Sequence, residues 1–203
     1  MMDVQPLYMP PEETEWQRKL SDDDDRFIVL AAGRRSGKTT KAVKRLAKRA
    51  VKRPNSVCWY VAPTYQQAKD IAWAKFKYTL SDAIDKNLVS KVHESDLYFK
   101  FRNGSIIQLK GGDKPDSLRG VGLTDLVLDE YAVMKPMIWE EVLRPSLSDQ
   151  IAPVMFIATP KGKNHFWKLF KKGEAGEAGW RSVLLKTSEA GTIPQSEIEQ
   201  ARR

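Results

Sequence analysis

Two short segments of the chain combine small residues, a lysine, a threonine and two acids in an order that suits catalysis. Residues Ala32–Thr39 read A-G-R-R-S-G-K-T, which is the spacing of a phosphate-binding loop with Ala32 in place of the first glycine. Residues Leu126–Glu130 read L-V-L-D-E, an apolar run that ends in two acids. In combination, these segments predict a site that binds a nucleoside triphosphate with magnesium and hydrolyses it.

Phosphate binding explains the residue types found in the loop. Small residues let backbone N–H groups close around phosphate oxygens, and the helix that follows directs its N-terminus at them. We expect Lys38 to reach the β- and γ-phosphates and the Thr39 hydroxyl to bind Mg²⁺. The alternative is a chance turn, but the loop lies between an apolar strand and a helix, which favours phosphate binding. The predicted nucleotide-binding residues are Gly33, Arg34, Arg35, Ser36, Gly37, Lys38, Thr39 and Thr40.

The two acids have different expected roles. The carboxyl ends of parallel strands line the crevice where ligands bind, so we expect Asp129 to hold magnesium through a water molecule. Glu130, one residue further, could orient and deprotonate an attacking water molecule. A solvated strand end is the alternative for an isolated Asp-Glu pair. A kinase would instead need a site for a hydroxyl-bearing acceptor, and the adjacent Glu130 favours water.

The elements around these segments indicate an α/β protein. In addition to the acidic strand, we predict strands over residues 27–31, 56–62, 153–158 and 181–185. We predict helices over residues 40–53, 66–80 and 165–172. In the 66–80 helix, we expect Ile71, Ala74 and Tyr78 to be buried. Residues 97–101 and 105–109 flank Arg-Asn-Gly and predict a hairpin insertion. Strands that alternate with helices predict a mostly parallel sheet covered on both faces, the architecture of an ASCE-type P-loop NTPase.

Composition limits the class of protein. The 203 residues suit one domain, and no apolar run has membrane-spanning length. The single cysteine, Cys58, lies in an apolar run and is most simply a core residue. These features predict an intracellular chain without a membrane segment. The formal net charge of +8 hints at a polyanionic partner.

Two basic features compete as the site for such a partner. Over residues 41–53, lysines and arginines recur at helical spacing opposite an apolar face, a pattern more typical of a solvated exterior. In the hairpin, the two-residue period places Lys100 and Arg102 on one face, and the second strand adds Lys110. We predict that these three residues contact nucleic-acid phosphates, with binding that weakens steeply as salt rises.

Several segments together resemble the ATPase domain of the large terminase subunit of tailed bacteriophages. The loop that carries Arg119 before the acidic strand, followed by A-T-P-K-G, is more specific than the phosphate loop alone. The resembling segments are Gly33–Thr39, Ala62–Tyr65, Asp116–Gly120, Val127–Glu130 and Ala158–Gly162.

The resemblance implies an ATP-driven motor that packages double-stranded DNA into a preformed viral shell. The implied partners are DNA, a portal protein, a small terminase subunit and further copies of the chain in a ring. The implied location is the host cytoplasm and, transiently, the portal of the procapsid, but not the mature virion.

The resemblance also implies roles for single residues. Arg34 would sense the γ-phosphate and act in catalysis with Lys38. Gln17 would read adenine, because its amide can donate and accept at once; a surface helix residue is the alternative. Arg119 would act on the ATP of a neighbouring subunit, and its alternative is a structural pair with Asp116 or Asp113.

Ala158, Thr159 and Pro160 would couple the state of the γ-phosphate to motion. The alternative for these residues is a strand capped by an ordinary Thr-Pro turn.

The expected organisation is an ATPase domain over residues 1–190 and the start of a linker over 191–203. Members of this family carry a nuclease domain after such a linker, so we expect ATPase activity without DNA cleavage from this chain. Three other functions stay open: a helicase-like ATPase, a regulatory module that binds nucleotide without hydrolysis, and a DNA-binding adaptor. Glu130 counts against the regulatory module, and intact Lys38 and Thr39 count against the adaptor.

Overall fold

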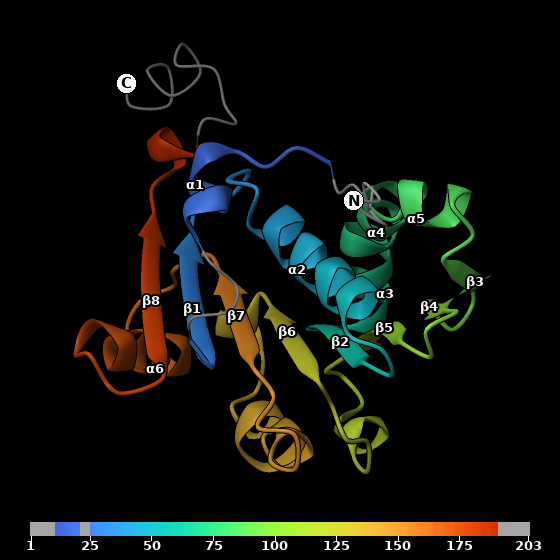
Figure 1. Ribbon diagram of the computed structural model, residues 1–203. Coiled ribbons are helices and arrows are strands. Elements are labelled where there is room, and N and C mark those ends of the chain that lie inside the picture. The colour runs from blue at the N-terminus through green and yellow to red at the C-terminus, as the bar shows by residue number, and fades with distance from the viewer. Residues whose placement is uncertain (1–10, 21–24, 191–203) are drawn as a thin grey trace.

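A single twisted sheet organises the computed structural model, which describes residues 11–20 and 25–190 (Figure 1). Its eight strands have the order β3-β4-β5-β2-β6-β7-β1-β8. Strands β5, β2, β6, β7, β1 and β8 are parallel, whereas β3, β4 and β5 pair in antiparallel fashion. The strands are β1 (Phe27–Ala32), β2 (Val57–Ala62), β3 (Val89–His93), β4 (Tyr98–Phe101), β5 (Ile106–Gly111), β6 (Asp125–Asp129), β7 (Val154–Ala158) and β8 (Trp180–Leu185).

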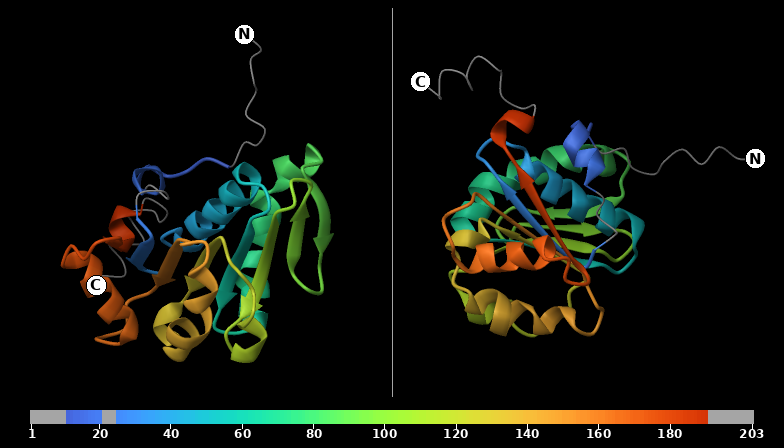
Figure 2. Two further views of the ribbon diagram at one scale, coloured as in Figure 1. Left: turned by 60° about the horizontal axis from the view of Figure 1, so that its bottom comes forward. Right: turned by 90° about the vertical axis from the view of Figure 1, so that its left-hand side faces the viewer.

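Helices cover both faces of the sheet, as Figure 2 shows. One face packs against α2 and the α3–α5 region, and the other against α6 and the short helices between β6 and β7. The helices are α1 (Glu15–Lys19), α2 (Lys38–Lys52), α3 (Tyr65–Ala68), α4 (Ala74–Thr79), α5 (Ser81–Asp85) and α6 (His165–Glu174). Single turns of 3₁₀-helix are η2 (Pro115–Leu118), η3 (Tyr131–Val133), η5 (Pro145–Leu147) and η6 (Thr187–Glu189), and π-helical turns are η1 (Lys69–Trp73) and η4 (Ile138–Leu143). The predicted α/β sandwich is therefore confirmed.

The predicted hairpin is also confirmed, and it belongs to the sheet. β4 pairs with β5 around the turn at residues 102–104, and β5 pairs in parallel with β2. The alternation holds as well, because Phe99 and Phe101 are buried while Lys100 is exposed. The hairpin thus extends one edge of the sheet instead of standing apart from it.

The predicted helix over residues 66–80 exists, but its predicted buried face is wrong. Ile71 and Tyr78 are 37% and 70% exposed, and Ala74 is exposed too. The π-helical turn η1 interrupts the helix, and the larger Trp73 and Phe76 occupy the core-facing positions instead. Both of these rings pack against Phe99 of β4, with ring centres 4.5 Å and 6.1 Å away, and this contact turns their side of the helix toward the core.

The expected linker at residues 191–203 and the acidic stretch at 21–24 lie outside the described residues. Within the described ranges, no helix has the length and apolar character needed to cross a bilayer.

Candidate functional site

The phosphate loop joins the end of β1 to the start of α2, as predicted. Gly33 lies against η6, where a Cβ atom would stand 2.2 Å from the Thr187 hydroxyl, so a larger residue would require the Thr187 side chain to move. Gly37 adopts φ of 84° and caps α2, whose N-terminus points its dipole into the loop. The Ser36 hydroxyl is buried and has no hydrogen-bond partner among the described residues. A buried donor of this kind fits a loop that closes around a phosphate oxygen.

The remaining loop residues lie at its rim and in the first turn of the helix. Arg34 and Arg35 are exposed, and Thr39 and Thr40 are half-buried. Arg34 also lines a hollow of about 210 Å³ beside the acids, together with Pro63, Gln67, Ile71, Asp129, Glu130, Val133, Thr159 and Lys161. The hollow therefore places the predicted γ-phosphate sensor within the same site as the predicted base.

Lys38 connects three strand ends. Its Nζ lies 3.2 Å from Glu130 Oε1 and donates to Thr159 Oγ1 at 3.2 Å. The backbone N–H of Thr159 donates to Glu130 Oε2 at 3.4 Å. Residues from β1–α2, β6 and β7 thus meet at the carboxyl edge of the sheet, where ligands of parallel sheets bind. Ala158 ends β7 inside the core. Pro160 lines a second hollow, of about 240 Å³, which lies over α6.

Asp129 is buried at the end of β6 with hydrogen bonds to both carboxylate oxygens. Oδ1 accepts the Glu130 N–H at 2.8 Å, and Oδ2 accepts the hydroxyls of Tyr60 and, at 3.4 Å, Thr39. Burial raises the pKa of Asp129 to about 6, and the Tyr60 hydrogen bond opposes this rise. The carboxylate is therefore held in place by hydrogen-bond donors that are themselves neutral.

Glu130 has an unusual backbone. Its φ of 49° and ψ of 38° lie in the left-handed region, which non-glycine residues seldom adopt. Such a conformation costs on the order of 1–3 kcal/mol and is found at functional sites more often than elsewhere. The turn directs the Glu130 carboxylate toward Lys38 and Thr159, one residue beyond the buried strand.

The donor set fits a magnesium ion that is bound jointly with phosphates. Thr39 Oγ1 and Asp129 Oδ2 are neighbouring hard oxygen atoms, the ligand type that Mg²⁺ prefers. In the part of the chain that the structure describes, no group of three acidic, His or Cys side chains could hold a metal alone. Two protein oxygens plus substrate phosphates and water would suit Mg²⁺, which usually keeps several waters.

Gln17 lies beside the phosphate loop, although it comes from α1. It is 2% exposed, so the alternative of a surface helix residue is wrong. Its Nε2 donates to the Gly37 carbonyl at 3.1 Å, and its Oε1 accepts from Thr14 N at 3.2 Å. This placement puts the amide next to the loop; reading of adenine stays a prediction.

Among the described residues, the contacts of Arg119 are with the loop before β6 and with η4. Its Nε lies 3.4 Å from Asp116 Oδ1, and its Nη1 donates to the Glu141 carbonyl at 3.4 Å. The side chains of Arg119 and Asp116 are 50% and 98% exposed, so the pair is weak and easily separated. The structural alternative is thus present as a contact, and action on a neighbouring subunit stays a prediction.

The three residues predicted to contact DNA are spread along the sheet extension. Lys100 is exposed on β4, whereas Arg102 donates to the Asn87 carbonyl at 2.8 Å. Lys110 Nζ lies 5.1 Å from the Trp59 ring centre, and burial lowers the pKa of Lys110. The structure leaves DNA binding by these residues as a prediction.

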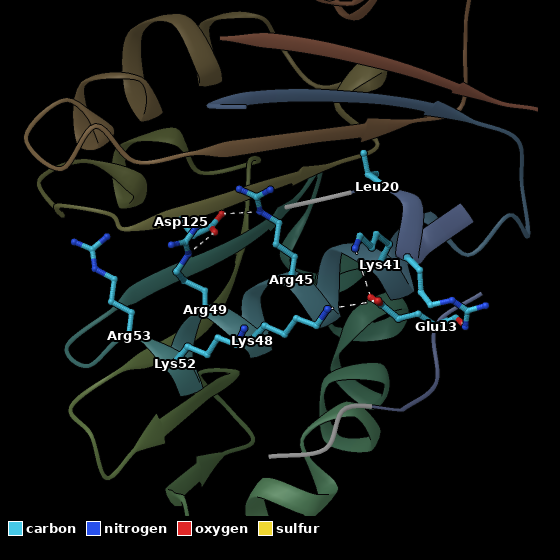
Figure 3. Close-up of a pocket in the computed structure, with 10 residues that line it drawn as sticks. Glu13, Leu20, Lys41, Arg45, Lys48, Arg49, Lys52, Arg53 and Asp125 are labelled. Carbon is cyan, nitrogen blue, oxygen red and sulfur yellow. Dashed lines mark hydrogen bonds and ion pairs between the residues drawn. The ribbon is translucent and has the colours of Figure 1, made fainter. Parts of the chain in front are cut away.

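The first half of the basic side of α2 is not the solvated exterior that we expected, whereas Lys52 and Arg53 at its end are exposed as expected. Lys41, Lys44 and Arg45 are each 2% exposed, because the segment before β1 and the start of β6 cover them. Glu13 lies 3.5 Å from Lys41 and 3.4 Å from Lys48. A cleft of about 320 Å³ remains over this face (Figure 3), lined by Glu13, Arg18, Leu20, Lys41, Arg45, Lys48, Arg49, Lys52, Arg53 and Asp125.

Two residues near these sites were missed at the level of the sequence. Tyr60 lies within the predicted strand over residues 56–62 and Asp125 lies directly before the acidic run, and neither of them is assigned a role by the sequence alone. Strand alternation could have indicated Asp125, since it shares one face of β6 with Asp129. The place of Tyr60 on the same side depends on the register in which β2 pairs with β6.

The fold and the loop define the class of the protein, a P-loop NTPase. The solved ATPase domain of the large terminase of Thermus phage P74-26 superposes with a TM-score of 0.78 at 24% identity, over 93% of this chain and 92% of that one. A large terminase from a second thermophilic bacteriophage, solved in complex with ADP, gives a TM-score of 0.74 at 20% identity, over 93% of this chain and 47% of that one.

The family follows from the sequence. A family model described as "Terminase large subunit, T4likevirus-type, N-terminal" matches residues 29–202, so the chain belongs to this family. The terminase large subunit of Thermus phage G20c is 31% identical over 187 residues, which cover 85% of this chain. That of Escherichia phage T5 is 27% identical over 192 residues, 91% of this chain. The chain spans only 36% and 42% of the lengths of these two relatives.

Proposed function

We propose that this chain is an ATP-hydrolysing motor domain that drives double-stranded viral DNA into a procapsid. The observation that carries the proposal is the meeting of Lys38, Asp129, Glu130 and Thr159 at one strand edge beside a phosphate loop. Family membership supports packaging as the process that hydrolysis serves. The partners would be DNA, a portal protein, a small terminase subunit and further copies in a ring, in the host cytoplasm and at the procapsid portal.

The residues divide the work as follows. Lys38 and the loop N–H groups would bind the β- and γ-phosphates, while Thr39 and Asp129 would hold Mg²⁺. The ion would neutralise charge on the phosphate oxygens. Glu130 is paired with Lys38 at 3.2 Å. When Lys38 turns to a phosphate, Glu130 would be released to accept a proton from water.

Four further residues would complete the site. Arg34 would sense the γ-phosphate from the rim, and Gln17 would hold adenine near Gly37. Arg119 would stabilise the transition state in a neighbouring subunit, because its side chain contacts Asp116 and Glu141 and no residue of its own phosphate loop that the structure describes. Thr159 would report γ-phosphate loss through its bond to Lys38.

A mixing experiment tests hydrolysis and ring action together. Glu130→Ala should bind a fluorescent ATP analogue as the wild type does and release no phosphate in the presence of DNA. Arg119→Ala should also bind and lose turnover by about three to five orders of magnitude, as other arginine fingers do. A mixture of the two should recover activity, because a ring then contains sites with an intact base and an intact finger.

Two results would contradict this proposal. Phosphate release by Glu130→Ala at the wild-type rate would remove the base assignment. Absence of recovery at every mixing ratio would place Arg119 within its own subunit. Lys38→Ala is the control, since it should lose nucleotide binding itself.

A further inference from the structure

The Asp129 carboxylate has a neighbour on the adjacent strand that no motif includes. β2 and β6 run in parallel, with Tyr60 opposite Val127. Asp129 is two residues beyond Val127 and lies on the same face of the sheet, so Tyr60 and Asp129 are diagonal neighbours. Tyr60 is 0% exposed, and its hydroxyl donates to Asp129 Oδ2.

We propose that the Tyr60 hydroxyl is a positioning group that fixes the rotation of the Asp129 carboxylate for magnesium. This inference rests on the proposed function, because it assigns Asp129 to the ion. Tyr60 itself would not touch the ion or the nucleotide.

The hydrogen bonds of Asp129 show why one side chain matters. Oδ1 is held by the backbone N–H of Glu130 at 2.8 Å, which substitution of a side chain leaves intact. Oδ2 receives Tyr60 and the more distant Thr39 hydroxyl at 3.4 Å. Because Thr39 would turn its oxygen to Mg²⁺, Tyr60 would be the side-chain donor that stays on Oδ2 during binding.

The ring of Tyr60 is itself fixed. It packs edge-on against Phe76 of α4, with ring centres 5.8 Å apart and an interplanar angle of 85°. A phenol held in this way cannot follow the carboxylate if it rotates. Residues that orient a metal ligand in this manner are worth about 10–100-fold in metal affinity or activity.

The opposing explanation is that Tyr60 only fills the core and that its buried hydroxyl donates a hydrogen bond to the nearest acceptor. A core-filling residue would affect stability alone. Replacing a positioning residue would lower the affinity for the metal ion, whereas the affinity for the nucleotide, measured without metal, would stay the same. These two outcomes are separable by measurement.

The test is a Mn²⁺ titration, followed by electron paramagnetic resonance, of the chain saturated with ATP-γ-S. Tyr60→Phe should bind Mn²⁺ about 10-fold or more weakly, with unchanged affinity for ATP-γ-S in EDTA. Tyr98→Phe is the matched control: it removes the same hydroxyl from β4, where Tyr98 stacks on His93 at 4.8 Å, and should leave Mn²⁺ binding unchanged. In an Asp129→Asn background, Tyr60→Phe should have no further effect, as expected for residues that act as a unit.

The outcomes separate this inference from the proposed function. Wild-type Mn²⁺ binding that Tyr60→Phe leaves unchanged would overturn the inference alone. An equal loss of Mn²⁺ affinity in Tyr98→Phe would also overturn it. So would a loss of Mn²⁺ affinity on Tyr60→Phe that is as large in the Asp129→Asn background as in the wild type. A wild type that binds no Mn²⁺ with ATP-γ-S would overturn the metal site and with it the proposed function.

Discussion

The two ends of strand β6 each bury an aspartate, and the two are held in different ways. Asp125 at its start is 0% exposed and Asp129 at its end is 1% exposed. Burial raises the pKa of both carboxyl groups. Asp125 is bound by two guanidinium groups, Arg45 Nε at 3.1 Å and Arg49 Nε at 3.2 Å. Asp129 is bound by hydroxyl and backbone donors that carry no charge.

The difference separates a structural carboxylate from one prepared for a ligand. At Asp125, the charge is compensated within the fold, and α2 is thereby attached to the sheet. At Asp129, the nearby cation Lys38 is already paired with Glu130 at 3.2 Å. The negative charge of Asp129 is thus balanced only weakly, which is a cost that a bound divalent cation would remove.

The largest expected effect comes from breaking the Asp125 cluster. Asp125→Asn leaves the buried Arg45 without its carboxylate, and we expect unfolding free energy to fall by about 3–5 kcal/mol. Urea denaturation measures this loss, and phosphate release per folded molecule should stay at the wild-type level. Replacing Asp125, Arg45 and Arg49 together by apolar residues of similar volume should restore most of the stability. A loss below about 1 kcal/mol in Asp125→Asn would mean that the cluster is energetically neutral.

Asp129→Asn should give the opposite result. The amide keeps the size of the side chain and removes the weakly balanced charge, so stability should stay the same or rise. Turnover should fall at least about 100-fold, because metal binding contributes several kcal/mol to the transition state. Denaturation and phosphate release, measured on the same preparation, check both parts. A stability loss as large as that of Asp125→Asn would make Asp129 structural and end the contrast between the two ends of β6.

The sequence was sufficient for parts of the site that are contiguous. The loop at residues 32–39 and the pair Asp129 and Glu130 are set by adjacent residues, and the strand–loop–helix order around them is confirmed. Their meeting with Thr159 follows from the parallel order of β6, β7 and β1, which alternating strands and helices already indicated.

What the sequence did not reveal depends on contacts between distant segments. Tyr60 meets Asp129 only because β2 and β6 pair in one register, and no local pattern fixes that register. The first half of the basic side of α2 was expected to face solvent because the residue that covers it comes from a separate segment: Glu13 lies 3.5 Å from Lys41. In the same way, the face of residues 66–80 was decided by Phe99, whose ring centre lies 4.5 Å from that of Trp73.

The smallest expected effect concerns an ion pair that resembles the Asp125 cluster in chemistry but not in burial. Arg119 and Asp116 lie 3.4 Å apart with side chains 50% and 98% exposed. Water screens such a pair, so Asp116→Asn should change unfolding free energy by no more than about 1 kcal/mol, and less at high salt. Urea denaturation at two salt concentrations measures it, and turnover should be retained because Arg119 keeps its charge. A loss of turnover without a loss of stability would mean that Asp116 aims Arg119, so that burial alone does not distinguish a functional pair from a structural one.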